Sequence, residues 1–458
     1  MRERILNSDN EQLKAKYSEW VAKKEVLTNV LSMSKEQLLE NQIVPEQLQL
    51  EIESLEKELS NGSELFAQGF ENKEVTWDLV QNVLMPNEVA IEMVRFRHFD
   101  QVFTDSVIYA GLVTRKGLDK PELIIMPNGH DLENKFMKGY RNSMKFKIPD
   151  RYSYANYWEP IKNKVGNFST IYLSADGVFN QINLETIPTG DGMYVLDNSN
   201  IVLVSNTKDI YFRRIKSEAA GKENKATMFG DPIFYASAGG SNKWSQLPGT
   251  KAEITALNDI LVENGWISDY YLEEYATEDN MKKIDNPKIL HVATHGFFTA
   301  DDAFEATEEV GMEDAKAAQN PLLRTGLLLY GAGDLLDKTS YNYNMEGGIL
   351  TAYEAMNMNL DYTELVVLSA CETGLGDVIS GEGVYGLQRA FLVAGADALV
   401  MSLFKVSDEA TQKLMVKFYE KWTQTGQMRN SFIEAKKELR NEYKDPIFWG
   451  AFVMIGME

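Results

Sequence analysis

The first part of the chain contains two stretches in which apolar side chains return every three or four positions. One stretch, NEQLKAKYSEWVAKKEVLTNVL, has a stripe made of Leu13, Tyr17, Trp20, Val21, Leu27, Val30 and Leu31. The other, PEQLQLEIESLEKELS, has Leu48, Ile52, Leu55 and Leu59 on one face. This spacing predicts amphipathic helices. Two interpretations stay open: a helical hairpin docked on the next domain, or the end of a helical-repeat array, whose repeats cannot bury their apolar faces alone.

From residue 75 the pattern changes to short apolar runs that alternate with helical stretches. The predicted strands are MPNEVAIEMVRFRHF, SVIYAGLVTR, PELIIMP, FSTIYLSADG and NIVLVSN, and the predicted helices are VTWDLVQNVL and YWEPIKNKVG. This alternation indicates a layered α/β domain. The polar stretch KSEAAGKENKA, 216–226, is typical of a linker.

A second α/β region follows this linker. Its predicted strands are ATMFGDP, PKILHVATHG, GLLLYG, TELVVLSAC and ADALVMSLFKV. Its predicted helices include GTKAEITALNDILVENG, GVYGLQRAFLVAG, SDEATQKLMVKFYEKW and RNSFIEAKKELRN, with Ser407 or Asp408 as the cap of the third. Apolar strands followed by helices predict a mostly parallel sheet with right-handed crossovers. Residues 299–320 are acidic and are expected to form a loop that gates the active-site cleft discussed below.

The pattern as a whole predicts an α/β fold with a mostly parallel sheet flanked by helices, preceded by a helical segment. We divide the chain into residues 1–63, 64–225 and 226–458. The last two regions show a hint of duplication, because STIYLSADG and PKILHVATHG share a buried strand that ends in a polar residue and glycine. Asp176 of the first copy stands where the second has His295.

Composition narrows the classes of partner. The formal net charge of −22 argues against binding nucleic acid, whose phosphates the chain would repel. A single cysteine excludes an internal disulfide and fits a reducing compartment. The polar N-terminus lacks the apolar core of a signal peptide, and no apolar run is long enough to span a membrane. We therefore expect a cytoplasmic protein without membrane or nucleic-acid partners.

Two of the four histidines lie four residues apart in KILHVATHGFF. On an extended strand their side chains are about 13 Å apart, too far for one metal ion, so no metal or cofactor is predicted. His291 lies within the strand and is expected to make a structural hydrogen bond. His295 lies at the carboxyl end, where parallel α/β sheets bind ligands, and Gly296 follows with a backbone N–H expected to face a substrate.

The only cysteine, Cys371, ends the apolar run LVVLSAC and precedes the glycine-rich ETGLGDVISGEG. A lone cysteine is commonly a small buried apolar residue. Here, however, the predicted sheet brings Cys371 to the same edge as His295, and an imidazole beside a thiol makes a nucleophilic thiolate. The backbone amides of Cys371 and Gly296 would then hold an oxyanion.

One further motif suggests a different class of function. GEGVYG, 381–386, matches the glycine pattern of a dinucleotide site before a helix. About nine residues separate it from the preceding strand, and Asp397 begins the next strand instead of ending it, both unlike such sites. A nucleotide-binding α/β protein is therefore kept only as a minor alternative, which predicts thermal stabilisation by nucleotides.

Several long motifs, in order, resemble the CHAT family of caspase-like peptidases associated with tetratricopeptide repeats. They are LMPNEVAIEMVRF, IYLSADGVFNQINLETIP, FGDP, LPGTKAEI, ILHVATHG, LSACETGLG, GEGVYGLQRAFLVAGADALVMSLFKVSDEAT and WGAFVMIG. The resemblance implies a cysteine endopeptidase with His295 as acid and base and Cys371 as nucleophile. It also implies a non-catalytic caspase-like half, 64–225, before a catalytic half, 226–458, and an upstream helical-repeat sensor in a bacterial defence or signalling pathway.

The substrate pocket departs from the related peptidases. Caspases have Gln two residues before the cysteine and Arg-cutting metacaspases have Asp, whereas this chain has Ser369. The candidate residues for binding a protein or peptide substrate are Asp231, Ser369, Asp377, Glu382 and Phe404. The acidic balance favours a basic or neutral P1 residue. The alternative function is a non-catalytic scaffold or signalling module that keeps the fold.

Overall fold

The computed structural model describes residues 10–31, 44–62, 74–215, 223–236, 243–298, 322–323, 325–336, 348–369, 382–405 and 407–457. Several predicted features lie outside these ranges. They are the acidic loop 299–320, most of the linker 216–226, Cys371 with the loop after it, and Asp377.

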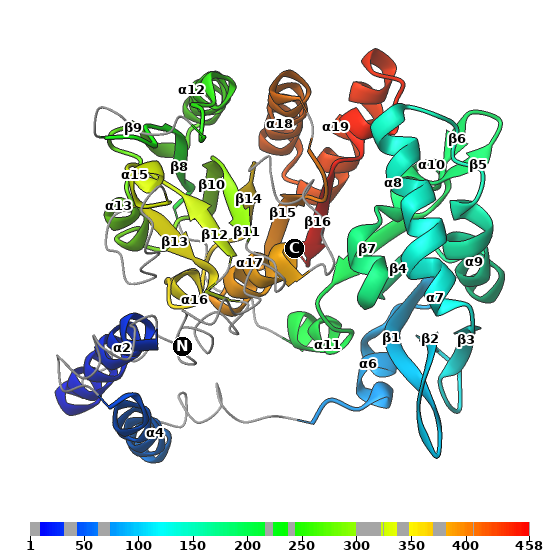
Figure 1. The fold of residues 1–458 in the computed structure, drawn as a ribbon, viewed down its shortest axis with the longest axis horizontal. Coiled ribbons are helices and arrows are strands. Elements are labelled where there is room, and N and C mark those ends of the chain that lie inside the picture. Colours follow the sequence, from blue (N-terminus) through cyan, green and yellow to red (C-terminus); the bar gives the residue numbers. More distant parts are fainter. Residues whose placement is uncertain are drawn as a thin grey trace, which may run out of the picture.

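One large sheet of eleven strands runs through the α/β part of the chain (Figure 1). From one edge to the other its strands are β3 (Glu122–Met126), β2 (Val102–Arg115), β1 (Glu88–Asp100), β4 (Thr170–Ser174), β7 (Asn200–Val204), β16 (Phe452–Gly456), β15 (Ala398–Ser402), β14 (Leu365–Leu368), β10 (Ile289–Ala293), β8 (Lys225–Pro232) and β9 (Ile267–Glu273). Every residue of β14 and β10 is buried, as their continuous apolar runs predict.

The strands form two parallel groups that run in opposite directions. β1, β4 and β7 are parallel to one another, and so are β15, β14, β10, β8 and β9. Between the groups, β16 is parallel to β7 but antiparallel to β15. Along the strand direction, the carboxyl ends of one group therefore lie at the opposite edge of the sheet from the carboxyl ends of the other. The prediction of a mostly parallel α/β sheet flanked by helices is confirmed, and its three-region division stays a prediction.

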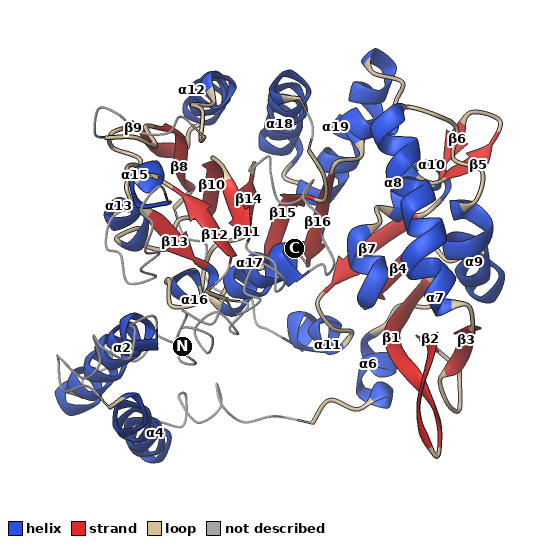
Figure 2. Cartoon of the chain, in the orientation of Figure 1, coloured by secondary structure: helices blue, strands red, loops and turns tan. Residues whose placement is uncertain are grey.

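Helices cover both faces of the β8–β15 group (Figure 2). On one face lie α12 (Pro248–Glu263), α18 (Asp408–Thr425), α19 (Met428–Glu442) and α20 (Pro446–Trp449). On the other lie α13 (Glu278–Lys282), α16 (Ala352–Ala355) and α17 (Glu382–Val393). The hydroxyl of Ser407 accepts a hydrogen bond from the N–H of Ala410 and caps α18, as predicted.

A small second sheet lies against this face. It contains β11 (Gly296–Phe298), β12 (Thr325–Leu328) and β13 (Ile349–Thr351), all antiparallel. The predicted strand GLLLYG is thus a strand, but it belongs to this separate sheet. The short helix α15 (Ala332–Leu336) follows β12.

The β1–β7 group is also covered on both faces. One face packs against α8 (Met137–Phe146), α9 (Glu159–Val165) and the short turns η1 (Leu132–Phe136), η2 (Tyr154–Trp158), η3 (Gly177–Gln181) and η4 (Leu184–Thr186). The other packs against α6 (Trp77–Val83) and α11 (Lys208–Ile215). The remaining small elements are α7 (Gly129–Asp131), β5 (Pro188–Gly190), β6 (Met193–Tyr194) and α10 (Val195–Asn198).

The N-terminal helices α2 (Glu11–Leu31) and α4 (Pro45–Gly62) pack side by side at the periphery (Figure 1). Their shared core contains Tyr17, Trp20, Leu27, Ile52, Leu55 and Leu59, which come from the two predicted stripes. The predicted amphipathic helices are confirmed, and α2 also touches α16.

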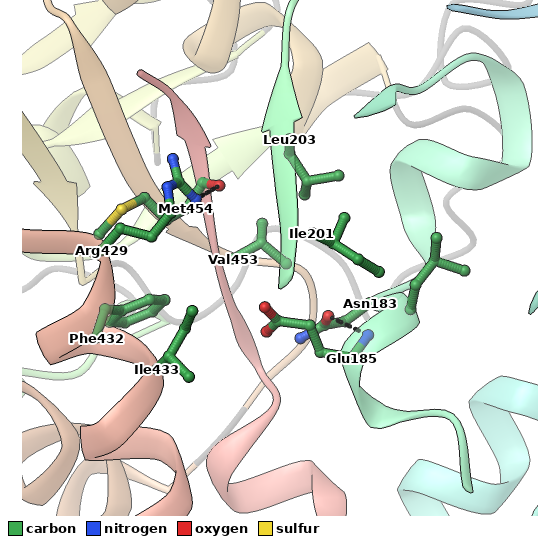
Figure 3. Close-up of a pocket in the computed structure, with 10 residues that line it drawn as sticks. Asn183, Glu185, Ile201, Leu203, Arg429, Phe432, Ile433, Val453 and Met454 are labelled. Atoms are coloured by element: carbon green, nitrogen blue, oxygen red, sulfur yellow. Dashed lines mark hydrogen bonds between the residues drawn. The ribbon is translucent and has the colours of Figure 1, made fainter. Parts of the chain in front are cut away.

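The two groups of strands meet at the junction of β7 and β16. β7 and β16 pair at Leu203 and Ile455. A small cavity of about 20 Å³ lies there, between these strands, the turn at Asn183 and helix α19 (Figure 3). The guanidinium of Arg429 donates to the carbonyls of Met454 and Gly456 beside this cavity.

Candidate functional site

The residues predicted to carry chemistry gather at one edge of the sheet. Asp231, His295, Ser369 and Phe404 lie at or just beyond the carboxyl ends of β8, β10, β14 and β15, which are consecutive parallel neighbours. The prediction that the strands before His295 and Cys371 end at one edge is confirmed. Strand β14 is shorter than predicted, because it ends at Leu368 and not at Cys371.

One ring nitrogen of His295 is hydrogen-bonded, and the other has no partner in the part of the chain that the structure describes. Its Nε2 lies 3.0 Å from the backbone carbonyl oxygen of Ser245. Because a carbonyl only accepts, Nε2 carries the proton, and Nδ1 of the neutral ring has a free lone pair. Among the described residues Nδ1 has no hydrogen-bond partner, although the side chain is only 5% exposed. This tautomer makes Nδ1 the atom that is able to accept a proton.

Two aromatic rings fix the plane of the His295 imidazole. The ring centroids of Phe234 and Trp244 lie 5.1 and 5.5 Å from that of the imidazole. Trp244 and Ser245 belong to the segment that precedes α12, so one short stretch supplies both a ring and the carbonyl. Sequence reasoning missed this orienting group, because every residue type has a backbone carbonyl.

Asp231 is a buried carboxylate with an incomplete set of partners. Its backbone N–H donates to the hydroxyl of Thr250, and the backbone N–H of Leu247 acts to lower the pKa of its carboxyl. Its Oδ1 is buried and has no hydrogen-bond partner in the described part of the chain. Burial, and then the charge of Glu273, raise the pKa of Asp231, while Lys251 opposes them. An added cation would therefore be stabilised here.

Beneath this edge the interior contains a network of polar side chains. His291 is fully buried, and its Nε2 lies 2.8 Å from Oε1 of Glu253 while its Nδ1 lies 3.0 Å from the hydroxyl of Tyr419. The predicted structural role of His291 is confirmed. The hydroxyl of Ser369 donates to Oε2 of the same Glu253 at 3.1 Å. Burial, followed by the charge of Glu253, raises the pKa of Tyr419 well above its usual value.

The other candidate residues have varied positions. Ser369 is only 2% exposed and its side chain faces α12, while Asp231 lies two strands away after β8. Phe404 is half-buried and packs against the cores of both strand groups. Gly296 is buried and begins β11 opposite Leu327. Glu382 begins α17, whereas Cys371 and Asp377 lie outside the described residues.

Two structural features are relevant to other classes of function. No group of three or more His, Cys, Asp and Glu residues there is arranged to hold a metal ion. No helix there combines the length and the apolar character needed to cross a membrane.

Two curated proteins match a short part of this chain. Tetratricopeptide repeat protein 28 of Mus musculus is 30% identical over 112 residues, which cover 24% of this chain and 4% of that protein. The protein of the same name from Homo sapiens is 29% identical over 112 residues, with the same coverage. This chain thus matches only a small part of the length of these relatives.

Two solved structures match this chain at low sequence identity. The Arg-specific cysteine proteinase gingipain R is 11% identical with a TM-score of 0.39, and the match covers 72% of this chain and 74% of that one. Separase of Saccharomyces cerevisiae, in complex with securin, is 11% identical with a TM-score of 0.37, and the match covers 96% of this chain and 27% of that one. The model of the CHAT domain matches residues 154–457, well over half of the sequence, and the chain therefore belongs to the CHAT family.

Proposed function

We propose that this chain is a cysteine endopeptidase in which His295 and Cys371 cleave a protein substrate. The observation that carries the proposal is the state of His295. It lies at the carboxyl edge of the sheet, with Nε2 bound to a carbonyl and Nδ1 buried without a hydrogen-bond partner among the residues that the structure describes. The neighbouring parallel strand β14 leads to Cys371 within three residues of its end.

The chemistry follows from this tautomer. Nδ1 of His295 takes the proton of the Cys371 thiol, and the thiolate attacks the carbonyl carbon of the scissile peptide bond. The backbone amides of Gly296 and Cys371 are proposed to bind the resulting oxyanion. The imidazolium then gives its proton to the leaving amine, which leaves a thioester. Water, deprotonated by His295, hydrolyses the thioester and restores the thiol.

The side chain of Asp231 is proposed to favour a basic P1 residue. Its buried carboxylate has a raised pKa and one oxygen with no hydrogen-bond partner in the described ranges, so a lysine or arginine side chain would supply a donor and a positive charge. The peripheral hairpin α2–α4, whose apolar faces pack on each other, is proposed to connect the peptidase to an upstream helical-repeat sensor. We place this regulated cleavage in a bacterial defence or signalling pathway.

Covalent labelling tests the proposal directly. Because Cys371 is the only cysteine, any thiol adduct found by intact mass reports on this residue alone. A peptide acyloxymethyl ketone with arginine at P1 should label the unaltered chain, and His295→Ala should slow labelling about a hundredfold or more. The matched control is His130→Ala, which changes an exposed histidine on α7, outside the β8–β15 group, and should label normally.

A second measurement separates a weak enzyme from a scaffold. The rate of Cys371 alkylation by iodoacetamide is followed against pH in the native and in the urea-unfolded chain. A paired thiol should show a lower pKa in the native chain, and His295→Ala should abolish this difference. Equal curves for all samples, with no peptide labelling, would favour the non-catalytic scaffold.

A further inference from the structure

We propose that Glu253 is a positioning residue that holds the strand of the nucleophile against the strand of the catalytic histidine. This inference rests on the proposed peptidase function and goes beyond it, because none of the residues involved takes part in the reaction itself. It arises from the buried network of Glu253, His291, Ser369 and Tyr419 below the catalytic edge.

The carboxylate of Glu253 is buried, which is unfavourable unless other groups stabilise it. It lies on α12 among residues of the apolar core, and it is only 2% exposed. A buried charge is stable only when donors surround it. Here two donors from two different strands meet it, because Oε1 bonds His291 of β10 and Oε2 bonds Ser369 at the end of β14.

The hydrogen atoms of the network have one consistent arrangement when His291 is neutral. The hydroxyl of Tyr419 donates to Nδ1 of His291, and Nε2–H of His291 donates to Glu253. The hydroxyl of Ser369 donates to the other carboxylate oxygen. Each of these donors then has an acceptor, so the network orients its members instead of only filling space.

Ser369 is fixed from two directions. Its backbone N–H donates to the carbonyl of Val292 on β10 at 2.9 Å, and its side chain bonds Glu253 on α12. Cys371 follows Ser369 by two residues, and His295 follows Val292 by three. The two proposed catalytic residues therefore extend from a layer in which their strands are clamped by one backbone bond and one shared carboxylate.

This contact assigns Ser369 to positioning and not to the substrate pocket. Loss of its hydroxyl frees the end of β14 while leaving the backbone ladder with β10 in place. Small displacements of a nucleophile reduce rates strongly, because an error of about 1 Å can cost about a hundredfold. The expected effect is on the rate of the bound complex and not on the affinity for the peptide.

The chain offers a matched control in its other strand group. Ser174 is also 2% exposed, also lies at the carboxyl end of a parallel strand, and its hydroxyl also donates to a glutamate, Glu92, at 2.6 Å. Ser174→Ala and Ser369→Ala thus remove the same kind of contact. Only the second lies at the edge with His295, because the two strand groups run in opposite directions.

The test measures the limiting labelling rate and the apparent affinity for the arginyl acyloxymethyl ketone. Ser369→Ala should lower the limiting rate by at least about tenfold with little change in affinity, while Ser174→Ala should keep the rate of the unaltered chain. Ser369→Thr, which retains the hydroxyl, should recover most of the rate. Glu253→Gln leaves one acceptor oxygen for two donors, so its limiting labelling rate should also be low. In the double variant Glu253→Gln with Ser369→Ala, the loss of rate should be much smaller than the product of the two single losses.

The outcomes separate this inference from the peptidase proposal. Equal rates for Ser369→Ala and the unaltered chain, or equal losses in Ser369→Ala and Ser174→Ala at similar melting temperatures, would overturn the positioning role. If the peptide reagent labels nothing, the pH dependence of Cys371 alkylation by iodoacetamide tests the positioning role. The lowered thiol pKa should then be present in the unaltered chain and absent in Ser369→Ala. A curve that His295→Ala leaves unaltered means that the peptidase proposal itself has failed.

Discussion

At the level of single residues, the carboxyl edge that His295 and Asp231 share contains buried polar atoms with no hydrogen-bond partner in the described part of the chain. Nδ1 of His295 and Oδ1 of Asp231 are both buried without partners among the described residues. Such groups are costly unless a ligand completes them. The segment at 243–247 influences both, because the carbonyl of Ser245 bonds Nε2 of His295 and the N–H of Leu247 acts to lower the pKa of Asp231.

Asp231→Asn tests the role of the second group without disturbing the backbone. Asp231 has φ 47°, a left-handed conformation that asparagine tolerates and alanine does not. Removing the charge should reduce the rate for an arginine P1 peptide relative to a norleucine P1 peptide by about tenfold. In the unaltered chain this preference should fade as the pH drops through the raised pKa, because protonation removes the charge. Fluorogenic peptides measure both, and an unchanged ratio would contradict the assignment.

At the scale of elements, the helical hairpin α2–α4 is a unit with its own core. Its buried side chains contact one another more than they contact the α/β part. Across the pair, Nε1 of Trp20 donates to Glu56, and Lys23 bonds Glu51 at 2.7 Å. Such a unit is expected to open separately from the large sheet.

Leu59→Ala should destabilise this hairpin by about 3 kcal/mol, because Leu59 is fully buried and the change leaves a cavity. Hydrogen exchange should speed up in α2 and α4 and stay unchanged in β10 and β14. Leu50→Ala, which alters a side chain that is 65% exposed on the same helix, should have little effect. Faster exchange in the central strands as well would show that the hairpin is not a separate unit.

At the scale of the whole molecule, side-chain pairs from α19 link the two strand groups. Arg440 bonds both carboxylate oxygens of Asp197 at 2.8 Å, and Lys436 bonds Glu185 at 2.7 Å. Burial lowers the pKa of Lys436, with Glu185 opposing. The hydrogen bonds from Arg440 lower the pKa of Asp197 more than burial raises it.

Asp197→Asn should therefore weaken the joint in a pH-dependent way. A carboxyl whose pKa is depressed in the folded state adds stability above its ordinary pKa of 3.8 and loses that contribution as the pH falls through the folded value. Urea unfolding at neutral pH should show a loss of about 1 kcal/mol, which shrinks in acid. The exposed Asp259→Asn is the control. A difference that persists unchanged in strong acid would rule out the ion pair as its cause.

Most of the elements, and the position of His295 after a buried strand, were predictable from the sequence. Runs such as ILHVA and LVVL are apolar throughout because both their faces are covered, and the three- and four-residue stripes of α2 and α4 record which faces pack. Local periodicity reports burial, so these features were predictable. The edge shared by His295 and the strand of Cys371 followed from the parallel order of the strands.

The surroundings of His295 were not predictable from the sequence, because they form only when the chain folds. Three features of the tertiary structure join residues that are far apart in the chain: the bond to the Ser245 carbonyl, the Glu253 network, and the pairing of β16 with β7. A backbone carbonyl has no signature in the sequence, and a glutamate on an amphipathic helix is normally expected to face solvent. β16 is antiparallel to β15, and this pairing gives the two strand groups their opposite directions. It depends on which distant segments come together when the chain folds. Local pattern encodes which faces are buried, whereas the partner of each buried polar group is chosen by the fold.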